Sequence, residues 1–578
     1  MKLYQLTFVF ALLLTVGCNK NPLDITPDGR QSIKDIFNDA SLTESYLNSA
    51  YLDVQLRGTN YHYWTMLSGI SDESHDADYP SQNFPVTQFL NGQLSPSYNP
   101  FDGGSASNDI NFYTKNWSGI RKTNVFLANA ISTPNLNEKA RLLAEAKVLR
   151  AYYYSELVKM YGNMPVITKQ FDDIAEFNNL SRNTIDETVA QIVKDCDEAI
   201  AEPSLPLRLI NEPERGRFTK SMAYVLKANA LLLSASPLWN STNDMSKWQA
   251  ASQAAKKALD DLTAGNNFRL SSNYETYFFG QSDINSNPTD RETIYEVKGF
   301  NERYKFAQLL YLMHSIPELG ASRAGNCPSQ ELVDAYDMKN GQQPVLGYSD
   351  EDHLQPIINA ASGYDEQNPY VNRDPRFYYT VYYNNAPFGA KIKGADFFIQ
   401  AYLGGSDGIS PLRTRTKTGY YLKKYKDPAV QTADAGSARF KVMRLAELYL
   451  NYAEAENEVN GPTAAVYEAL RVVRARVDMP NVESDLTKDQ MRLRIRKERM
   501  VELAFEEHRM WDVRRWKIMG QTDKLTTGME WTRLSNGTFT GKRIVSGKRN
   551  AWQEKYLLFP IPLSDISKLP MFKQNPGW

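Results

Sequence analysis

Paired helical blocks constrain the fold of this chain more than any other feature of its sequence. Residues 219–262 and 442–477 each carry apolar residues at spacings of three and four, interrupted by a short loop. Ser236-Pro237 ends the first helix of one pair, and Gly461-Pro462 ends the first helix of the other. These segments therefore predict stacked antiparallel helices of the tetratricopeptide type, although no clean repeat of about 34 residues is visible.

Two further blocks predict long single helices. One has an expected N-cap at Asn137 and a stop at Gly162. The other starts with a capping box at Thr487 and is expected to continue to Trp516. Its high charge density favours a solvated helix face, with an apolar end near the two tryptophans.

Two irregular regions separate the helical blocks. Residues 58–116 are rich in Gly, Ser, Asn, Pro and aromatic residues, and residues 264–440 mix short β-like runs, such as 376–383, with turns. The sequence thus predicts a mainly α-helical fold with irregular loop regions and a few short strands. Long loops in a compact protein are usually functional.

The first seventeen residues have the pattern of a signal peptide. Lys2 precedes an apolar run that is shorter than the about 20 residues needed to cross a bilayer. The run ends in Leu14-Thr15-Val16-Gly17-Cys18, which resembles a bacterial lipobox. That resemblance implies cleavage before Cys18, a thioether-linked lipid on its sulfur and an acylated amine. Residues 18–30 are polar and contain Pro and Gly, which favours a tether.

Charge and composition argue against several function classes. The chain of 578 residues has 66 Lys and Arg against 67 Asp and Glu, so it lacks the basic excess of a nucleic-acid binder. Five histidines and three cysteines, none in a HExxH pattern, offer little for a metal site, and we expect no cofactor. The sequence leaves open whether Cys196 and Cys327 bond to each other.

An acidic cluster offers one catalytic alternative. Asp72, Glu73, Asp76 and Asp78 lie around His75. Paired carboxylates could hydrolyse a glycoside if they flanked a sugar at about 5–9 Å. Solvated or capping carboxylates, or a calcium site, are the simpler interpretations, so we predict no catalytic residues.

Aromatic residues in the irregular regions favour ligand binding. An aromatic ring can stack on the C–H face of a sugar while Asn, Asp or Arg side chains bind its hydroxyls. Core packing is the competing interpretation for each single ring. The candidate ligand-binding residues are Tyr61, Trp64, Tyr79, Asn83, Phe84, Tyr98, Asn99, Arg303, Tyr304 and His314.

Several segments spread along nearly the whole chain form a recognisable set: RAYYY (150–154), LVKMYGNMPV (157–166), ASPLWN (235–240), PSQELVDAY (328–336), NRDPRF (372–377), RLAELYLNYAEA (444–455), ERMVELAFEEHRMWD (498–512), FPIP (559–562) and QNPGW (574–578). Together, and in this order, they resemble one family, the SusD/RagB lipoproteins of the Bacteroidetes outer membrane. Family members often carry acidic residues directly after the lipidated cysteine, whereas Asn19-Lys20-Asn21 follows here.

The resemblance implies a SusD-like α/α superhelix of four tetratricopeptide-like helix pairs, with irregular segments forming the ligand face. It implies a lid on a SusC-type TonB-dependent transporter, which captures oligosaccharides, or in some members peptides, without catalysis. It also implies an outer-membrane location, lipid-anchored and facing outward. We expect a signal peptide at 1–17, a tether at 18–30, an N-terminal SusD-like region at 31–263 and a C-terminal SusD/RagB region at 264–578, packed as one unit.

Overall fold

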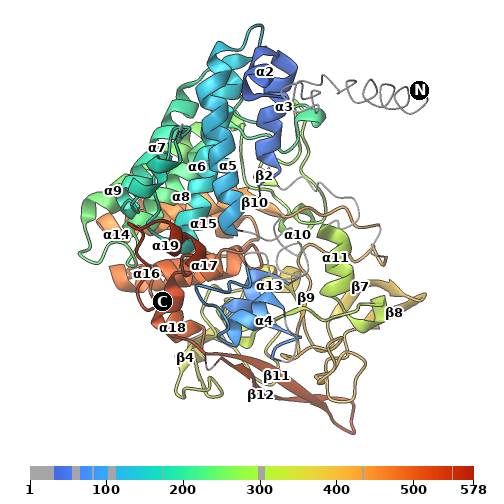
Figure 1. Cartoon of the computed structure of the whole chain (residues 1–578). Helices are drawn as coiled ribbons and strands as arrows, with labels where there is room; N and C mark the ends of the chain where they lie inside the picture. The colour runs from blue at the N-terminus through green and yellow to red at the C-terminus, as the bar shows by residue number, and fades with distance from the viewer. Residues whose placement is uncertain are drawn as a thin grey trace, which may run out of the picture.

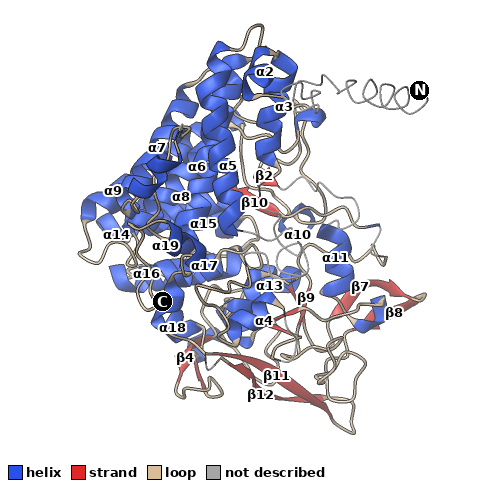
Figure 2. Cartoon of the chain, viewed as in Figure 1, coloured by secondary structure: helices blue, strands red, loops and turns tan. Residues whose placement is uncertain are grey.

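The structure is a computed structural model in which long helices gather on one side and short strands on the other. It describes residues 31–54, 65–80, 84–101, 112–171, 173–296, 306–432, 435–549 and 551–578. The long helices occupy the upper left of the view, and most of the strands lie in its lower half (Figure 1 and Figure 2). The fold is mainly helical, as the sequence predicts. The predicted signal peptide at 1–17, Cys18 and the predicted tether at 18–30 lie outside the described residues.

The helical scaffold is a continuous series in which each helix packs against the next. The order is α5 (Phe112–Asn129), α6 (Lys139–Tyr161), α7 (Ile185–Ala201), α8 (Lys220–Ala235), α9 (Met245–Thr263), α14 (Leu445–Asn460) and α15 (Ala464–Ala475). In addition, α3 (Ala40–Tyr51) packs beside α5, α2 (Ile33–Asn38) packs against α3, and α16 (Lys488–Glu502) packs on α14. The predicted pairs at 219–262 and 442–477 are confirmed as α8–α9 and α14–α15.

The irregular second region is inserted into this scaffold. Helices α9 and α14 pack against each other although residues 264–444 separate them in the sequence. The scaffold therefore holds both ends of the inserted region at adjacent positions. This arrangement fixes where the loops of the inserted region begin and end.

Local signals placed most helix ends correctly. Gly162 and Gly461 are C-caps with φ of 71° and 75°, a conformation that glycine adopts easily, and Thr487 forms the predicted capping box with Gln490. The N-cap predicted at Asn137 is wrong. The residue before α6 is Glu138, with φ of 50° and no side-chain cap bond, so the helix begins one residue later than expected.

The helix predicted from Thr487 to Trp516 is broken. Helix α16 ends at Glu502, and α17 (Arg509–Arg515) starts after a turn in which Phe505 and Glu507 have positive φ values of 59° and 64°. The amide N–H of Phe505 donates to Glu73 Oε1 at 2.8 Å. A partner far away in the sequence therefore takes a backbone group that a continuous helix would use itself.

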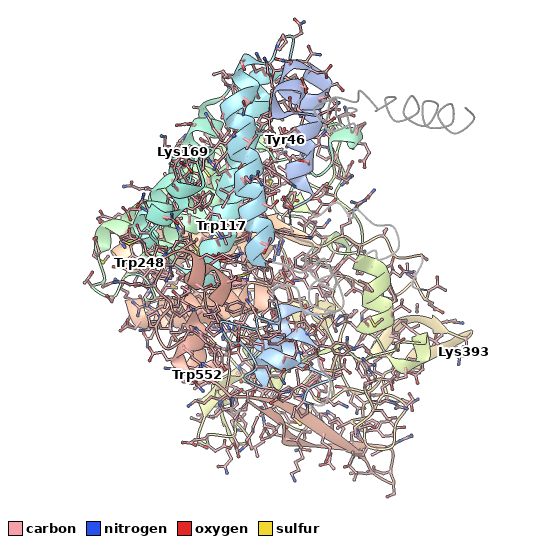
Figure 3. The ribbon with its side chains drawn as sticks, in the orientation of Figure 1. Tyr46, Trp117, Lys169, Trp248, Lys393 and Trp552 are labelled. Carbon is pink, nitrogen blue, oxygen red and sulfur yellow. The ribbon has the colours of Figure 1, made fainter. Side chains whose placement is uncertain are left out.

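Antiparallel strand pairs form the sheets of the other half. They are β1 (Ser74–Asp76) with β3 (Asn326–Pro328), β2 (Thr293–Glu296) with β10 (Lys441–Arg444), β4 (Val345–Tyr348) with β5 (Pro356–Ile358), β6 (Val381–Tyr382) with β9 (Tyr421–Leu422), β7 (Pro387–Ile392) with β8 (Ala395–Phe398), and β11 (Leu525–Arg533) with β12 (Phe539–Lys548). Figure 3 places Lys393 at the outer tip of the β7–β8 hairpin, away from the scaffold.

Short helices lie between these strands. They are α4 (Pro85–Leu90), α10 (Tyr274–Tyr277), α11 (Phe306–Met313), α12 (Gln330–Ala335), α13 (Pro375–Thr380), α18 (Met519–Thr522) and α19 (Leu563–Lys568). The β-like run at 376–383 is therefore mostly helical. Pro375 at the first helical position and the Asp374 cap start α13 there, and only Val381 and Tyr382 pair as a strand.

The charged face of α16 is buried, so the expectation of a solvated face is wrong. Glu498 accepts hydrogen bonds from Arg376 at 2.5 Å and from Arg474 at 2.7 Å. Glu502 accepts from Arg444 at 2.7 Å and from Arg376 at 2.9 Å. Arg376 and Arg444 belong to the inserted region, whereas Arg474 lies on the neighbouring scaffold helix α15. Both sources bring arginines to the carboxylates of α16 in the interior.

Candidate functional site

The two irregular regions meet around the β1–β3 pair. His75 on β1 is opposite Cys327 on β3, and the side-chain oxygen of Asn326 accepts the amide N–H of Met66 at 2.9 Å. Arg549, just after β12, donates to four carbonyl oxygens of the same region, those of Gly69, Ile70, Ser71 and Ser74. Loops more than two hundred residues apart in the sequence are thus joined into one packed unit.

The acidic cluster holds these loops together. Asp72 accepts two hydrogen bonds from Arg509, both at 2.7 Å, and Asp78 accepts two from Arg413, at 3.0 and 3.2 Å. Arg323 contacts both Asp76 and Asp78. All four carboxylates are buried, so they do not form the open pair across a sugar that glycoside hydrolysis requires.

Glu73 gives this cluster a pH dependence. Burial raises the pKa of Glu73 to about 8, whereas the unfolded value is about 4.3. Its contribution to stability is complete below about pH 4.3 and is lost as the pH rises through 8. In urea unfolding, we expect the free energy of unfolding of the wild type to fall by about 1 kcal/mol per pH unit between pH 5 and 7 because of this group. Glu73→Gln should remove that slope, and an unchanged slope would contradict a buried protonated carboxyl.

The most promising ligand contact is an aromatic ring that lies beside two arginines. Phe84 is the residue before α4, and its ring centroid lies 4.9 Å from the Arg323 guanidinium carbon and 5.8 Å from that of Arg413. The Arg323 side chain is 1% exposed, whereas that of Arg413 is 45% exposed. Asp78 fixes both arginines, so an exposed guanidinium stands beside a partly exposed ring. Such a surface can stack on a sugar ring and donate N–H groups to its hydroxyls.

Tyr98 lies at the same short helix. It is 40% exposed, and its hydroxyl donates to Gln88 on α4 at 2.9 Å. Tyr79 is partly buried, with its hydroxyl bonded to the Lys548 carbonyl at 2.9 Å. Helix α4 therefore brings Phe84 and Tyr98 together, while Tyr79 anchors the preceding loop to β12.

Two other candidate residues, Asn99 and His314, make structural contacts. Asn99 donates to the Tyr161 hydroxyl at 3.3 Å, at the end of α6. His314 is fully buried, and its Nδ1 accepts the amide N–H of Asn326 at 3.1 Å. A ligand has no surface of His314 to contact, so we remove it from the candidate set. The apolar helix around His314 gave no sequence sign that β3 would cover it.

Five candidates lie outside the described residues: Tyr61, Trp64, Asn83, Arg303 and Tyr304. Sequence reasoning missed Arg323 and Arg413, because nothing in their local sequence indicates that they meet Phe84. Both free cysteines, Cys196 and Cys327, are buried and form no disulfide. In the described ranges, His, Cys, Asp and Glu side chains form no group of three suited to a metal ion, and no helix is long and apolar enough to cross a membrane.

Comparison with known proteins decides the family. A model described as "SusD family" matches residues 299–578, and one described as "Starch-binding associating with outer membrane" matches residues 23–232. The chain belongs to the SusD/RagB family. The two matches leave residues 1–22 and 233–298 unassigned. They agree with the resemblance found in the sequence.

Individual relatives of this SusD/RagB protein are similar over most of its length. "SusD-like protein P2" of Formosa agariphila is 22% identical over 537 residues, which is 90% of this chain and 91% of the relative. A SusD-like protein from Bacteroides fragilis has a TM-score of 0.73 at 24% identity and covers 94% of this chain and 98% of its own. A SusD-like carbohydrate binding protein from the same species has a TM-score of 0.69 at 24% identity, covering 93% and 100%. These similarities establish the fold.

Proposed function

We propose that this protein is a glycan-binding lipoprotein that captures oligosaccharides and delivers them to a SusC-like TonB-dependent transporter, without catalysing a reaction. The observation that carries the proposal is the surface at α4, where Phe84 lies beside the exposed Arg413 and the exposed Tyr98 is bonded to Gln88 of the same helix. Membership of the SusD/RagB family and a structural relative titled as carbohydrate binding support it. An uncharged ligand also suits a chain whose net charge is −1.

The binding test starts with a glycan array and continues with calorimetry on the oligosaccharides that bind. We expect Phe84→Ala and Arg413→Ala each to weaken affinity by about tenfold, since each removes a contact of about 1–1.5 kcal/mol. Arg471→Ala is the matched control, because Arg471 is exposed on scaffold helix α15 and pairs only with Glu468 in the described contacts. Unchanged affinity in both test variants would contradict this site.

The same experiment separates the alternatives. Saturable binding of peptides with no glycan signal would favour a peptide-binding lid of the same fold. Shortened oligosaccharides in the binding mixture would instead favour a glycoside hydrolase. We expect no shortened oligosaccharides, because the carboxylates of the Asp72–Asp78 cluster are buried.

The proposed anchor is tested through Cys18. With the lipid attached to its sulfur, each buried CH₂ adds about 0.8 kcal/mol of membrane affinity. We expect Cys18→Ala to leave the protein soluble or uncleaved, as measured by membrane fractionation. Outer-membrane fractionation that does not change would overturn the lipid anchor.

A further inference from the structure

A cavity lies on the helical side of the molecule, apart from the α4 surface. It is lined by residues of α6, α8 and α14 and of the segment 506–515, and α6, α8 and α14 belong to the group of long helices in Figure 1. Its volume is about 130 Å³, less than the roughly 300–1,000 Å³ of pockets for drug-sized ligands. The cavity therefore suits a small group. Its polar lining includes Asn229, Glu447 and His508, and Trp511 contributes an aromatic wall.

Glu447 lines this cavity with a carboxylate that lacks a cation. The residue is 4% exposed, and its Oε1 accepts a hydrogen bond from the Asn229 amide at 2.8 Å. In the described part of the chain, no Lys or Arg nitrogen lies within 4.0 Å of the carboxylate, and Oε2 has no hydrogen-bond partner. A buried carboxylate without a cationic partner is unfavourable.

His508 does not supply the missing charge. Its Nδ1 lies 3.9 Å from Glu447 Oε1, beyond hydrogen-bond distance. Burial lowers the pKa of His508 below its usual value. The imidazole is therefore neutral at pH 7 and forms no ion pair with Glu447.

The rest of the cavity is rigid and suits a cation with an alkyl part. Arg499 donates to Asn451 at 2.7 Å, and Asn451 donates to Asn229 at 2.6 Å, which fixes the amide that faces Glu447. The Trp511 ring already has one cation near it, since Lys159 Nζ lies 5.1 Å from its centroid. Apolar side chains complete the wall, namely Val158, Leu226, Leu233, Val442 and Met443.

We propose that this cavity binds a small organic cation with a primary ammonium group, which donates to Glu447 Oε2 while its alkyl part packs against Trp511. The compact ammonium fits the small volume better than a planar guanidinium. A charge-assisted hydrogen bond to a desolvated carboxylate is the strong kind. This site is independent of the proposed glycan site, and it can be tested whether or not glycans bind.

The test uses n-butylammonium chloride as the probe and 1-butanol as its neutral counterpart, at constant ionic strength. Calorimetry on the purified protein should show saturable binding of butylammonium and none of butanol. Glu447→Gln should weaken butylammonium affinity by at least about tenfold, the scale of a hydrogen bond to a charged group. Glu468→Gln, which neutralises an exposed glutamate on α15, is the matched control and should bind as the wild type does.

A second readout is the melting temperature of the protein. Without ligand, Glu447→Gln should melt at the same temperature as the wild type or higher, because the neutral amide still accepts from Asn229. Butylammonium should raise the melting temperature of the wild type only. Trp511→Leu serves if Glu447→Gln fails to fold, and it should weaken binding by removing the ring. Equal binding of butanol, absence of saturable butylammonium binding, or undiminished affinity in the foldable variant would overturn the proposal.

Discussion

Replacing Glu502 with alanine is expected to lower the free energy of unfolding by about 3–5 kcal/mol, the cost of breaking a buried ion pair by removing one partner. Glu502 is fully buried at the end of α16 and receives hydrogen bonds from Arg444, Arg376 and Arg476. Without the Glu502 carboxylate, these three guanidinium groups remain buried with less negative charge around them. Urea unfolding followed by circular dichroism measures the loss.

The control for this prediction is an exposed carboxylate of the same scaffold. Glu468→Ala removes a partner of Arg471 whose side chain is more than half exposed, so it should cost less than about 1 kcal/mol. A loss for Glu502→Ala as small as that of the control would show that water reaches the charges between the two halves of the molecule.

The buried ion pairs at the end of α16 also predict that the stability of the protein falls at acidic pH. Burial alone would raise the pKa of Glu506, but Arg444 and Lys424 lower it to about 2. Since the unfolded value is about 4.3, its stabilising contribution is present above that pH and is lost as the pH falls toward 2. We expect Glu506→Gln to be less stable than the wild type at pH 7 and to lose less on acidification to pH 3. Equal acid sensitivity of the two proteins would contradict this assignment.

Gly119→Leu is expected to lower the free energy of unfolding by roughly 3 kcal/mol, at the upper end of typical overpacking costs. A Cβ at Gly119 on α5 would lie 2.3 Å from two ring carbons of Tyr153 on α6. The ring cannot easily move, because Tyr153 is fully buried and its hydroxyl donates to the Ala50 carbonyl of α3 at 2.6 Å. The contact therefore locks three helices together, and thermal unfolding measures its loss.

A double-mutant cycle tests the mechanism. In a Tyr153→Ala background the ring is absent, so Gly119→Leu should cost much less than it does in the wild type. Equal costs in both backgrounds would assign the effect to some other contact of Gly119.

Much of the helical scaffold was predictable from local sequence. Its helices repeat apolar residues with the helical period, and their ends carry residues with a direct local effect. Gly461 can take positive φ, and the Thr487 side chain can cap the first turn. These effects involve neighbours within a few residues, so the sequence expresses them without knowledge of the fold.

The break after Glu502 shows where local reasoning stops. Periodicity alone continues the helix toward Trp516, yet Phe505 leaves it to donate its N–H to Glu73. The buried face of α16 has in part the same origin, since Arg376 reaches Glu498 and Glu502 from more than one hundred residues away. Charge patterns do not indicate which charges another segment will cover.

The candidate site, like the scaffold, was only partly predictable from the sequence. The sequence by itself determined the scaffold helices, the family and the irregular regions rich in aromatic residues, because each follows from local order along the chain. Only the tertiary structure decided that His314 is interior, that the acidic cluster joins loops, and that Arg323 and Arg413 meet the Phe84 ring. Those outcomes depend on tertiary contacts, and the contacts of the acidic cluster and of Phe84 join residues more than two hundred positions apart. Packing, with its burial and charge pairing, selects such contacts only once the whole chain has folded.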